Sequence, residues 1–114
     1  MPFEQHEEKQ YRRNVTSIYQ AALTAIGKLN GTVVASAPER CHLEVKFPKT
    51  ILGKTLGERT YLTLDVTGQE ETSQVTIDAY PLDAIDRKLL FGARKGVTRT
   101  VVNWLIEQID QQLA

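Results

Sequence analysis

Three segments of this chain alternate apolar and polar residues with a period of two, and this pattern limits the fold more than any other feature. The segments are residues 41–47, 59–67 and 72–80. Because successive side chains of a strand point to opposite faces of a sheet, each segment predicts a strand with one apolar and one polar face. A further strand is predicted at residues 32–37 and ends before Pro38, since proline cannot join a strand ladder.

Two amphipathic segments flank the predicted strands. Apolar residues recur at helical spacing over residues 10–29 and again over residues 97–113. Short loops between the strands favour an antiparallel meander, and the apolar stripes of both helices must be buried. We therefore predict a two-layer α+β fold with the order helix, four-stranded antiparallel meander, helix, in which both helices pack on one face of the sheet.

The alternation also predicts which side chains form the core. The core face of the predicted sheet carries Leu43, Val45, Leu62, Leu64, Val75 and Ile77. The length of 114 residues fits one domain. We predict a single α+β domain over residues 10–114, preceded by a flexible acidic lead-in at residues 1–9.

Composition excludes several classes of protein. Fourteen acidic residues balance fourteen basic ones, which argues against a general nucleic-acid coat protein. Cys41 is the only cysteine, so an intrachain disulfide and a thiolate zinc site are both excluded. His6 and His42 lie too far apart in sequence for metal-ligand spacing, and we predict no metal site, no cofactor and no catalytic residue. No apolar run approaches ~18 residues and no signal peptide is recognisable, so we predict a cytoplasmic protein without a membrane span.

Charge is distributed unevenly near the second helix. Residues 65–86 contain six acids and no base, whereas residues 87–99 contain five bases and no acid. Gly96 directly precedes the helix, where free backbone N–H groups and the helix dipole attract anions. The predicted site for an anion or an acidic partner comprises Arg87, Lys88, Arg94, Lys95, Gly96, Thr98 and Arg99. The alternative is that these bases pair with Asp83, Asp86 and the acids of the preceding strand.

The face of the sheet opposite the helices offers a second candidate surface. It is predicted to carry His42, Glu44, Lys46, Tyr61, Thr63, Asp65, Thr76, Asp78 and Tyr80. His42, Tyr61 and Tyr80 are the predicted interface residues, because large amphipathic side chains are enriched at interfaces. A homodimer through this face and a solvated polar face are the alternatives.

These patterns favour a small binding module over an enzyme. The principal hypothesis is a non-enzymatic cytoplasmic protein that binds an anionic ligand or an acidic protein through residues 87–99. The alternative is a carrier of small apolar ligands, with a cavity beside Trp104 between the curved sheet and the second helix. A third hypothesis is an enzyme with His42 as base and Asp65 or Asp78 as its partner.

Two further functions are set aside. Nucleic acid is not the expected partner, because no nucleic-acid motif is present and the open face carries acids. Gly53-Lys54-Thr55 resembles the end of a P-loop, but that motif requires a glycine where Pro48 stands.

Overall fold

The computed structural model describes residues 4–83, 85, 87–89 and 96–114. The elements follow in the order β1 (Gln5–Tyr11), α1 (Val15–Lys28), β2 (Thr32–Ala37), β3 (His42–Phe47), β4 (Thr50–Ile51), β5 (Lys54–Thr55), β6 (Arg59–Gly68), β7 (Ser73–Leu82) and α2 (Val97–Leu113). A short 3₁₀ turn, Pro38–Arg40, joins β2 to β3. Neither helix in this described part has the length and apolarity needed to cross a membrane.

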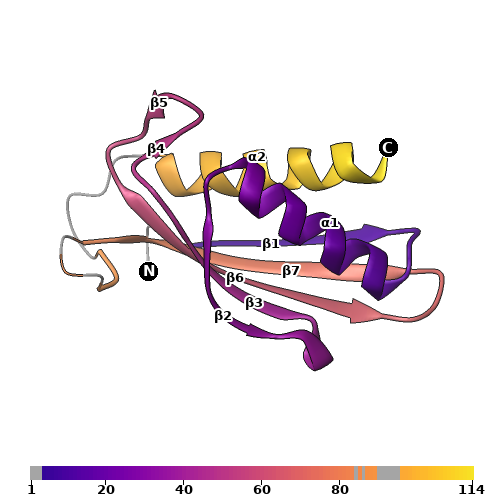
Figure 1. Ribbon diagram of the computed structural model, residues 1–114. Coiled ribbons are helices and arrows are strands. Elements are labelled where there is room, and N and C mark those ends of the chain that lie inside the picture. Colours follow the sequence, from indigo (N-terminus) through magenta and orange to yellow (C-terminus); the bar gives the residue numbers. More distant parts are fainter. Residues whose placement is uncertain (1–3, 84, 86, 90–95) are drawn as a thin grey trace.

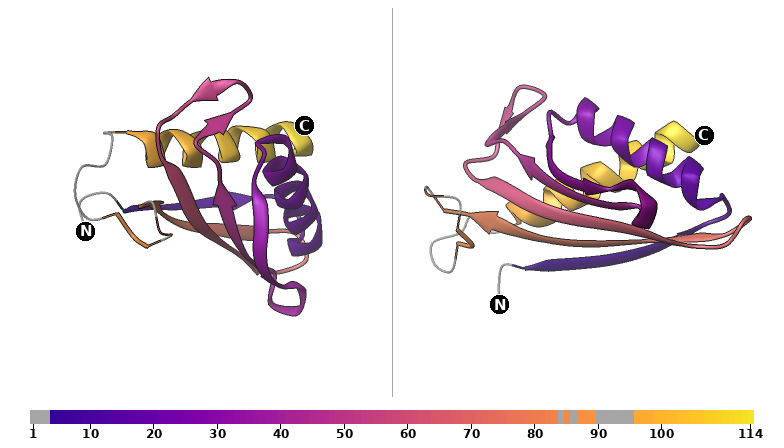
Figure 2. Two further views of the ribbon diagram at one scale, coloured as in Figure 1. Left: turned by 60° about the vertical axis from the view of Figure 1, so that its left-hand side comes forward. Right: turned by 60° about the horizontal axis from the view of Figure 1, so that its bottom comes forward.

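Five strands form one antiparallel sheet in the order β1-β7-β6-β3-β2. Both helices lie on the same face of this sheet, and the opposite face is left open (Figure 1). α2 packs over β7 and β1, α1 packs over β6 and β2, and the helices pack against each other (Figure 2). The predicted α+β fold with two helices on an antiparallel sheet is confirmed. The four predicted strands, β2, β3, β6 and β7, pair in the order of a meander, but the sheet has five strands rather than four, because β1 pairs with β7.

The core follows from the alternation in the three central strands. Leu43, Leu64 and Ile77 lie side by side in register across β3, β6 and β7, and none is more than 1% exposed. All six side chains predicted for the core face are buried. The helices complete the core from above with Ile18, Ala22, Ala25, Ile26, Val101, Val102, Leu105 and Ile109.

Strand β1 occupies the region predicted as a flexible lead-in. Its seven residues pair with β7 from Gln5 opposite Ala79 to Tyr11 opposite Ser73. The positions that face the helices carry mostly polar side chains, and these bind α2 directly. Lys9 Nζ lies 2.6 Å from Asp110 Oδ2. The lead-in prediction therefore fails for residues 5–9, which are built into the sheet.

Helix α1 begins at Val15, five residues later than predicted, because β1 and a short connection precede it. Asn14 is its N-cap, and its side-chain oxygen accepts a hydrogen bond of 2.7 Å from the backbone N–H of Ser17. At the other end, Gly31 N donates to Ile26 O at 2.9 Å. A Cβ on Gly31 would lie only 2.8 Å from side-chain atoms of Ile26 and Phe47, so this turn requires glycine.

The connection between β3 and β6 contains the small hairpin β4–β5. Leu52 and Gly53 form its turn with φ of 51° and 81°, the left-handed values that a tight two-residue hairpin uses. Ile51 is fully buried and closes one end of the core, whereas Leu52 is 60% exposed. Ile51 therefore anchors the hairpin in the core.

Candidate functional site

The open face of the sheet brings together the predicted interface residues. On this face His42 lies opposite Asp65, Glu44 opposite Thr63, and Tyr61 opposite Tyr80. Antiparallel register alone sets these neighbours, because residues directly opposite each other have side chains on the same face. The result is a row of polar and aromatic contacts across β3, β6 and β7.

His42 is held between two carboxylates. Its Nδ1 lies 2.6 Å from Asp65 Oδ1, and its Nε2 lies 3.1 Å from Glu44 Oε2. Because ionised carboxylates only accept hydrogen bonds, both ring nitrogens donate when the ring is an imidazolium. These bonds, the one to Asp65 first, raise the pKa of His42 above its ordinary value. Neither nitrogen is left to act as a base on a substrate.

The predicted catalytic pair of His42 with Asp78 does not form. Asp78 instead contacts His6 on β1, with 2.6 Å between His6 Nδ1 and Asp78 Oδ1. His6 Nε2 also lies 2.9 Å from Glu8 Oε2, so it repeats the arrangement around His42. The hydrogen bond to Asp78 is the main reason why the pKa of His6 is raised. Of the two acids predicted as catalytic partners of His42, Asp65 contacts it and Asp78 contacts His6 instead.

Tyr61 and Tyr80 form a fixed aromatic pair. Their rings are stacked with centroids 5.4 Å apart and planes 18° from parallel. The Tyr61 hydroxyl donates to Glu44 Oε1, and this bond is the main reason why the pKa of Glu44 is lowered. Burial, followed by the carboxylate of Glu44, raises the pKa of Tyr61 to about 12. Tyr61 is therefore a neutral donor near neutral pH, and its hydroxyl is held by Glu44.

The turn after β7 brings a cation to this aromatic pair. Lys88 Nζ lies 4.8 Å from the centroid of the Tyr80 ring and also pairs with Glu4. The turn is shaped by Asp83, whose Oδ1 accepts hydrogen bonds of 2.9 Å from the backbone N–H groups of Ile85 and Arg87. The bond from Arg87 N–H is the main cause of the lowered pKa of Asp83.

Each described basic residue of segment 87–99 forms an ion pair with an acidic residue. Arg87 pairs with Asp83 at 3.4 Å, although the arginine side chain is 73% exposed. Arg99 Nη1 donates to Glu7 Oε2 at 2.7 Å. The prediction that these bases pair with Asp83 is confirmed for Arg87, whereas Lys88 and Arg99 pair with acids at or before β1. Arg94, Lys95 and Asp86 lie outside the described residues.

The start of α2 holds two residues of the predicted anion site, Gly96 and Thr98. Gly96 precedes α2 with φ of 86°, and its carbonyl accepts hydrogen bonds from the backbone N–H and the hydroxyl of Thr100. Thr98 is only 5% exposed. Thr98 therefore lies on the buried side of the first turn of α2, which does not favour its predicted part in an anion site.

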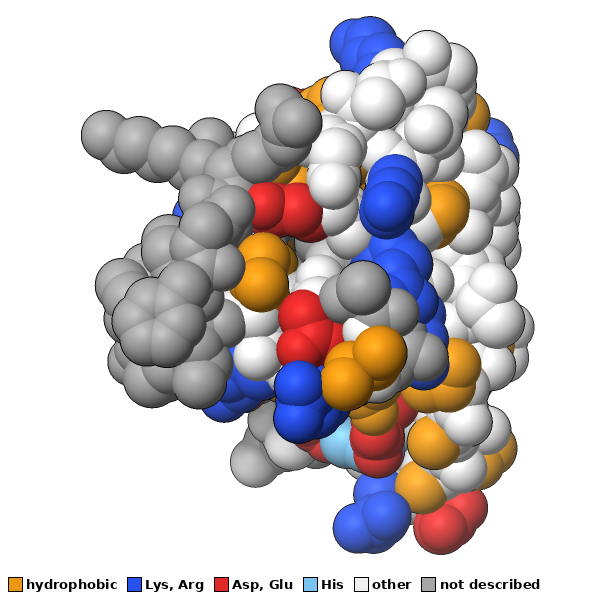
Figure 3. All heavy atoms as spheres, turned by 90° about the vertical axis from the view of Figure 1, so that its left-hand side faces the viewer, with side chains coloured by type: hydrophobic (Ala, Val, Ile, Leu, Met, Phe, Trp, Pro, Cys, Tyr) orange, Lys and Arg blue, Asp and Glu red, His pale blue; other side chains and the backbone are white. Residues whose placement is uncertain are grey.

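Figure 3 shows the end of the molecule at which β7 leads toward α2. Among the described residues visible there, lysines and arginines are interspersed with aspartates, glutamates and hydrophobic side chains (Figure 3). The described part of the surface is therefore of mixed sign rather than uniformly basic.

Two of the hollows formed by the described residues are lined by residues other than His42, Tyr61 and Tyr80. One, of about 180 Å³, is lined by Leu29, Ile51, Leu52, Lys54, Trp104, Glu107 and Gln108. Lys54 Nζ lies 5.3 Å from the centroid of the Trp104 ring. This hollow lies between α2 and the β4–β5 hairpin rather than between α2 and the sheet.

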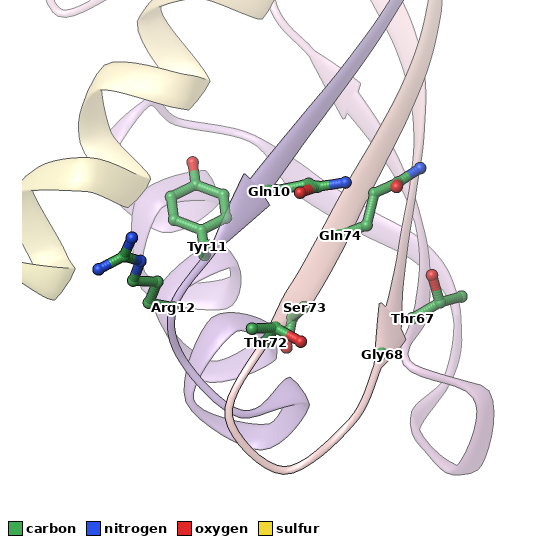
Figure 4. A pocket seen from close by; sticks show the side chains of 8 residues that line it. All are labelled: Gln10, Tyr11, Arg12, Thr67, Gly68, Thr72, Ser73 and Gln74. Atoms are coloured by element: carbon green, nitrogen blue, oxygen red, sulfur yellow. The ribbon is translucent and has the colours of Figure 1, made fainter.

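The other hollow, of about 470 Å³, lies where β1 leads into α1 beside the β6–β7 hairpin (Figure 4). It is lined by Gln10, Tyr11, Arg12, Thr67, Gly68, Thr72, Ser73 and Gln74. Tyr11 and Arg12 lie on one side of β7 and Thr67 on the other, so these side chains do not converge on one point (Figure 4). Among the described residues, no group of three His, Cys, Asp or Glu side chains is placed to hold a metal ion.

No protein-family model matches the chain, and no curated protein matches it in sequence. Its fold is similar to that of a structural-genomics target from Nitrosospira multiformis, with a TM-score of 0.63, 9% identity, and coverage of 97% of this chain and 96% of that one. A protein from Thermus thermophilus is similar with a TM-score of 0.55 and 13% identity, over 96% of this chain and 95% of the other. At such low identity the likeness shows the fold alone.

Sequence reasoning missed the contribution of β1 to this surface. Glu4, His6 and Glu8 were assigned to the lead-in, yet they supply partners for Lys88, Asp78 and Gln74. One signal was present: His6 and Glu8 have the same spacing as His42 and Glu44. Residues two apart share a face only in a strand, so this repeat favoured an extended segment.

Proposed function

We propose that this protein is a non-enzymatic binding module that recognises an acidic segment of a partner protein. The observation that carries the proposal is the contact of Lys88 with Tyr80, which stacks on Tyr61. Because of it, the cationic turn and the aromatic pair form one continuous surface. Stacked tyrosines offer a large contact area at low cost in side-chain entropy, and cations beside them select acidic groups.

The ion pairs within the chain are compatible with such a partner. Exposed pairs contribute only about 0–1 kcal/mol, so a partner carboxylate can replace Asp83 at Arg87 or Glu4 at Lys88 at little cost. Arg94 and Lys95 extend the proposed surface along the sequence. The lone cysteine favours a reducing compartment, and we place the interaction in the cytoplasm.

A titration with an acidic aromatic peptide tests this function. The probe is a fluorescein-labelled peptide in which glutamates alternate with tryptophans. We expect amide NMR shifts concentrated at Tyr61, Tyr80 and Lys88, and the double variant Arg87→Glu with Lys88→Glu should weaken binding at least about tenfold, or about 1.4 kcal/mol. Fluorescence anisotropy measures the affinity, and circular dichroism checks the fold.

The matched control is Lys28→Glu with Arg40→Glu, which changes the net charge equally at two exposed positions of α1 and the 3₁₀ turn. It should retain the affinity. Equal weakening in both double variants would indicate a general charge effect. That result, or shifts that avoid the two tyrosines, would refute the proposed surface.

A second candidate function, carriage of a small ligand, is favoured by the hollow beside Trp104. Its volume of about 180 Å³ suits a single aromatic ring rather than a fatty chain. Gln108 lines the hollow, and its buried Oε1 has no hydrogen-bond partner among the described residues. Such an acceptor favours an apolar ligand with one donor group.

Trp104 is the only tryptophan and reports on this hollow directly. We expect phenol to quench its fluorescence saturably and at lower concentration than toluene, because phenol can donate to Gln108. Gln108→Leu should remove this preference, while Gln111→Leu, an exposed position on the same helix, should keep it. Equal responses to both ligands in the unaltered protein would argue against the carrier.

A further inference from the structure

The two edges of the sheet differ sharply in composition. β1 forms one edge and contains Glu7, Glu8 and Lys9. β2 forms the other edge, and its sequence from Thr32 to Ala37 contains no charged residue and no proline. Charged side chains and prolines are the usual means by which edge strands avoid pairing with other chains. β1 has this protection, whereas β2 has neither charges nor prolines and carries only a register shift between Val33 and Ala35.

β2 also exposes apolar surface beside its free backbone. Val33 and Val34 are 39% and 46% exposed, and they account for two of the four exposed large hydrophobic residues in the described part of the chain. A register shift between Val33 and Ala35 leaves Val34 without a partner on β3. The strand therefore presents unpaired backbone groups and adjacent valines at the same place.

We propose that β2 is a homodimer interface, in which it pairs antiparallel with β2 of a second copy. Antiparallel pairing of a strand with its own copy obeys two-fold symmetry: where residue i of one copy lies opposite residue j of the other, residue j of the first copy lies opposite residue i of the second. The strand carries no charge that this pairing would set against itself, and the chain's formal net charge of zero removes long-range repulsion between copies. A second copy would thus offer an uncharged strand that can hydrogen-bond to the free backbone groups of β2, and apolar side chains that can cover its exposed valines.

This interface differs from a dimer through the open face. Pairing at β2 would join the two sheets edge to edge and leave both copies of the Tyr61–Tyr80 pair uncovered. α1 packs over the β2 side of the sheet, so the two α1 helices would approach each other (Figure 2). The proposal is therefore independent of the proposed binding function.

Sedimentation equilibrium of the full chain over a wide concentration range tests the proposal. We expect a reversible dimer that Val34→Lys weakens at least tenfold, because the substitution places two like charges beside each other at the pairing edge. The control Gln10→Lys adds the same charge to an exposed position on β1 and should leave dimerisation unchanged. Hydrogen exchange should show β2 amides that become protected with rising concentration in the unaltered protein and not in Val34→Lys.

Three results would overturn the proposal. The first is a monomer at all concentrations, including millimolar protein. The second is a dimer that Val34→Lys leaves intact while circular dichroism shows a native fold. The third is a dimer that Tyr61→Lys disrupts and Val34→Lys does not, which would place the interface on the open face.

Discussion

Replacing Leu64 with aspartate should unfold the protein. Leu64 is fully buried at the centre of β6, between Leu43 on β3 and Ile77 on β7. The substitution removes roughly 1.5–3 kcal/mol of apolar burial and places a carboxylate among aliphatic side chains, at a cost of several kcal/mol more. Because domains of this size are stable by only about 5–15 kcal/mol, we expect loss of cooperative thermal unfolding, measured by circular dichroism. Ile77→Asp should act in the same way.

Two controls separate this effect from a general intolerance of β6. Thr67→Asp introduces the same carboxylate at an exposed position of the same strand and should change the free energy of unfolding by less than about 0.5 kcal/mol. Leu64→Met keeps the volume and should cost under about 1.5 kcal/mol. A folded Leu64→Asp protein with a native melting curve would mean that β6 does not present this face to the core.

The sequence was most informative where one face of a strand is mostly apolar. β3, β6 and β7 alternate because their inner side chains meet the apolar stripes of two helices. β1 obeys the same geometry, but its inner face meets the polar flank of α2 through Lys9–Asp110 and Glu7–Arg99. A strand that is bound by ion pairs has no apolar period, so hydrophobic patterning could not reveal it.

The candidate surface could be predicted only in part for a related reason. Alternation predicted that His42, Tyr61 and Tyr80 share the open face. The partners of these side chains are set by the register between neighbouring strands. This register depends on the tertiary structure and not on the pattern within one strand. Lys88 pairs with Glu4 across 84 positions of sequence, a contact that follows only once β1 is placed beside β7.

Deleting residues 1–9 should destabilise the protein by several kcal/mol. The deletion removes the ladder from Gln5 to Lys9 and exposes the edge of β7, and each lost hydrogen bond costs roughly 0.5–1.5 kcal/mol. It also leaves Asp110 and Arg99 on α2 without the partners that β1 provides. At about 4 °C per kcal/mol, the melting temperature should fall by more than about 10 °C. A flexible lead-in would predict no change.

The variant His6→Ala with Glu8→Ala distinguishes the role of the β1 backbone from that of its outward side chains. Both side chains are 54% exposed, and their contacts with Asp78 and Gln74 lie on the solvated face. Because exposed ion pairs contribute about 0–1 kcal/mol, the melting temperature of this variant should lie within a few degrees of that of the unaltered protein. The melting temperature of the deletion variant should be lower by more than that. Equal melting temperatures for the deletion and the full chain would show that β1 contributes nothing to stability. The fold would then rest on the four strands that the sequence predicted.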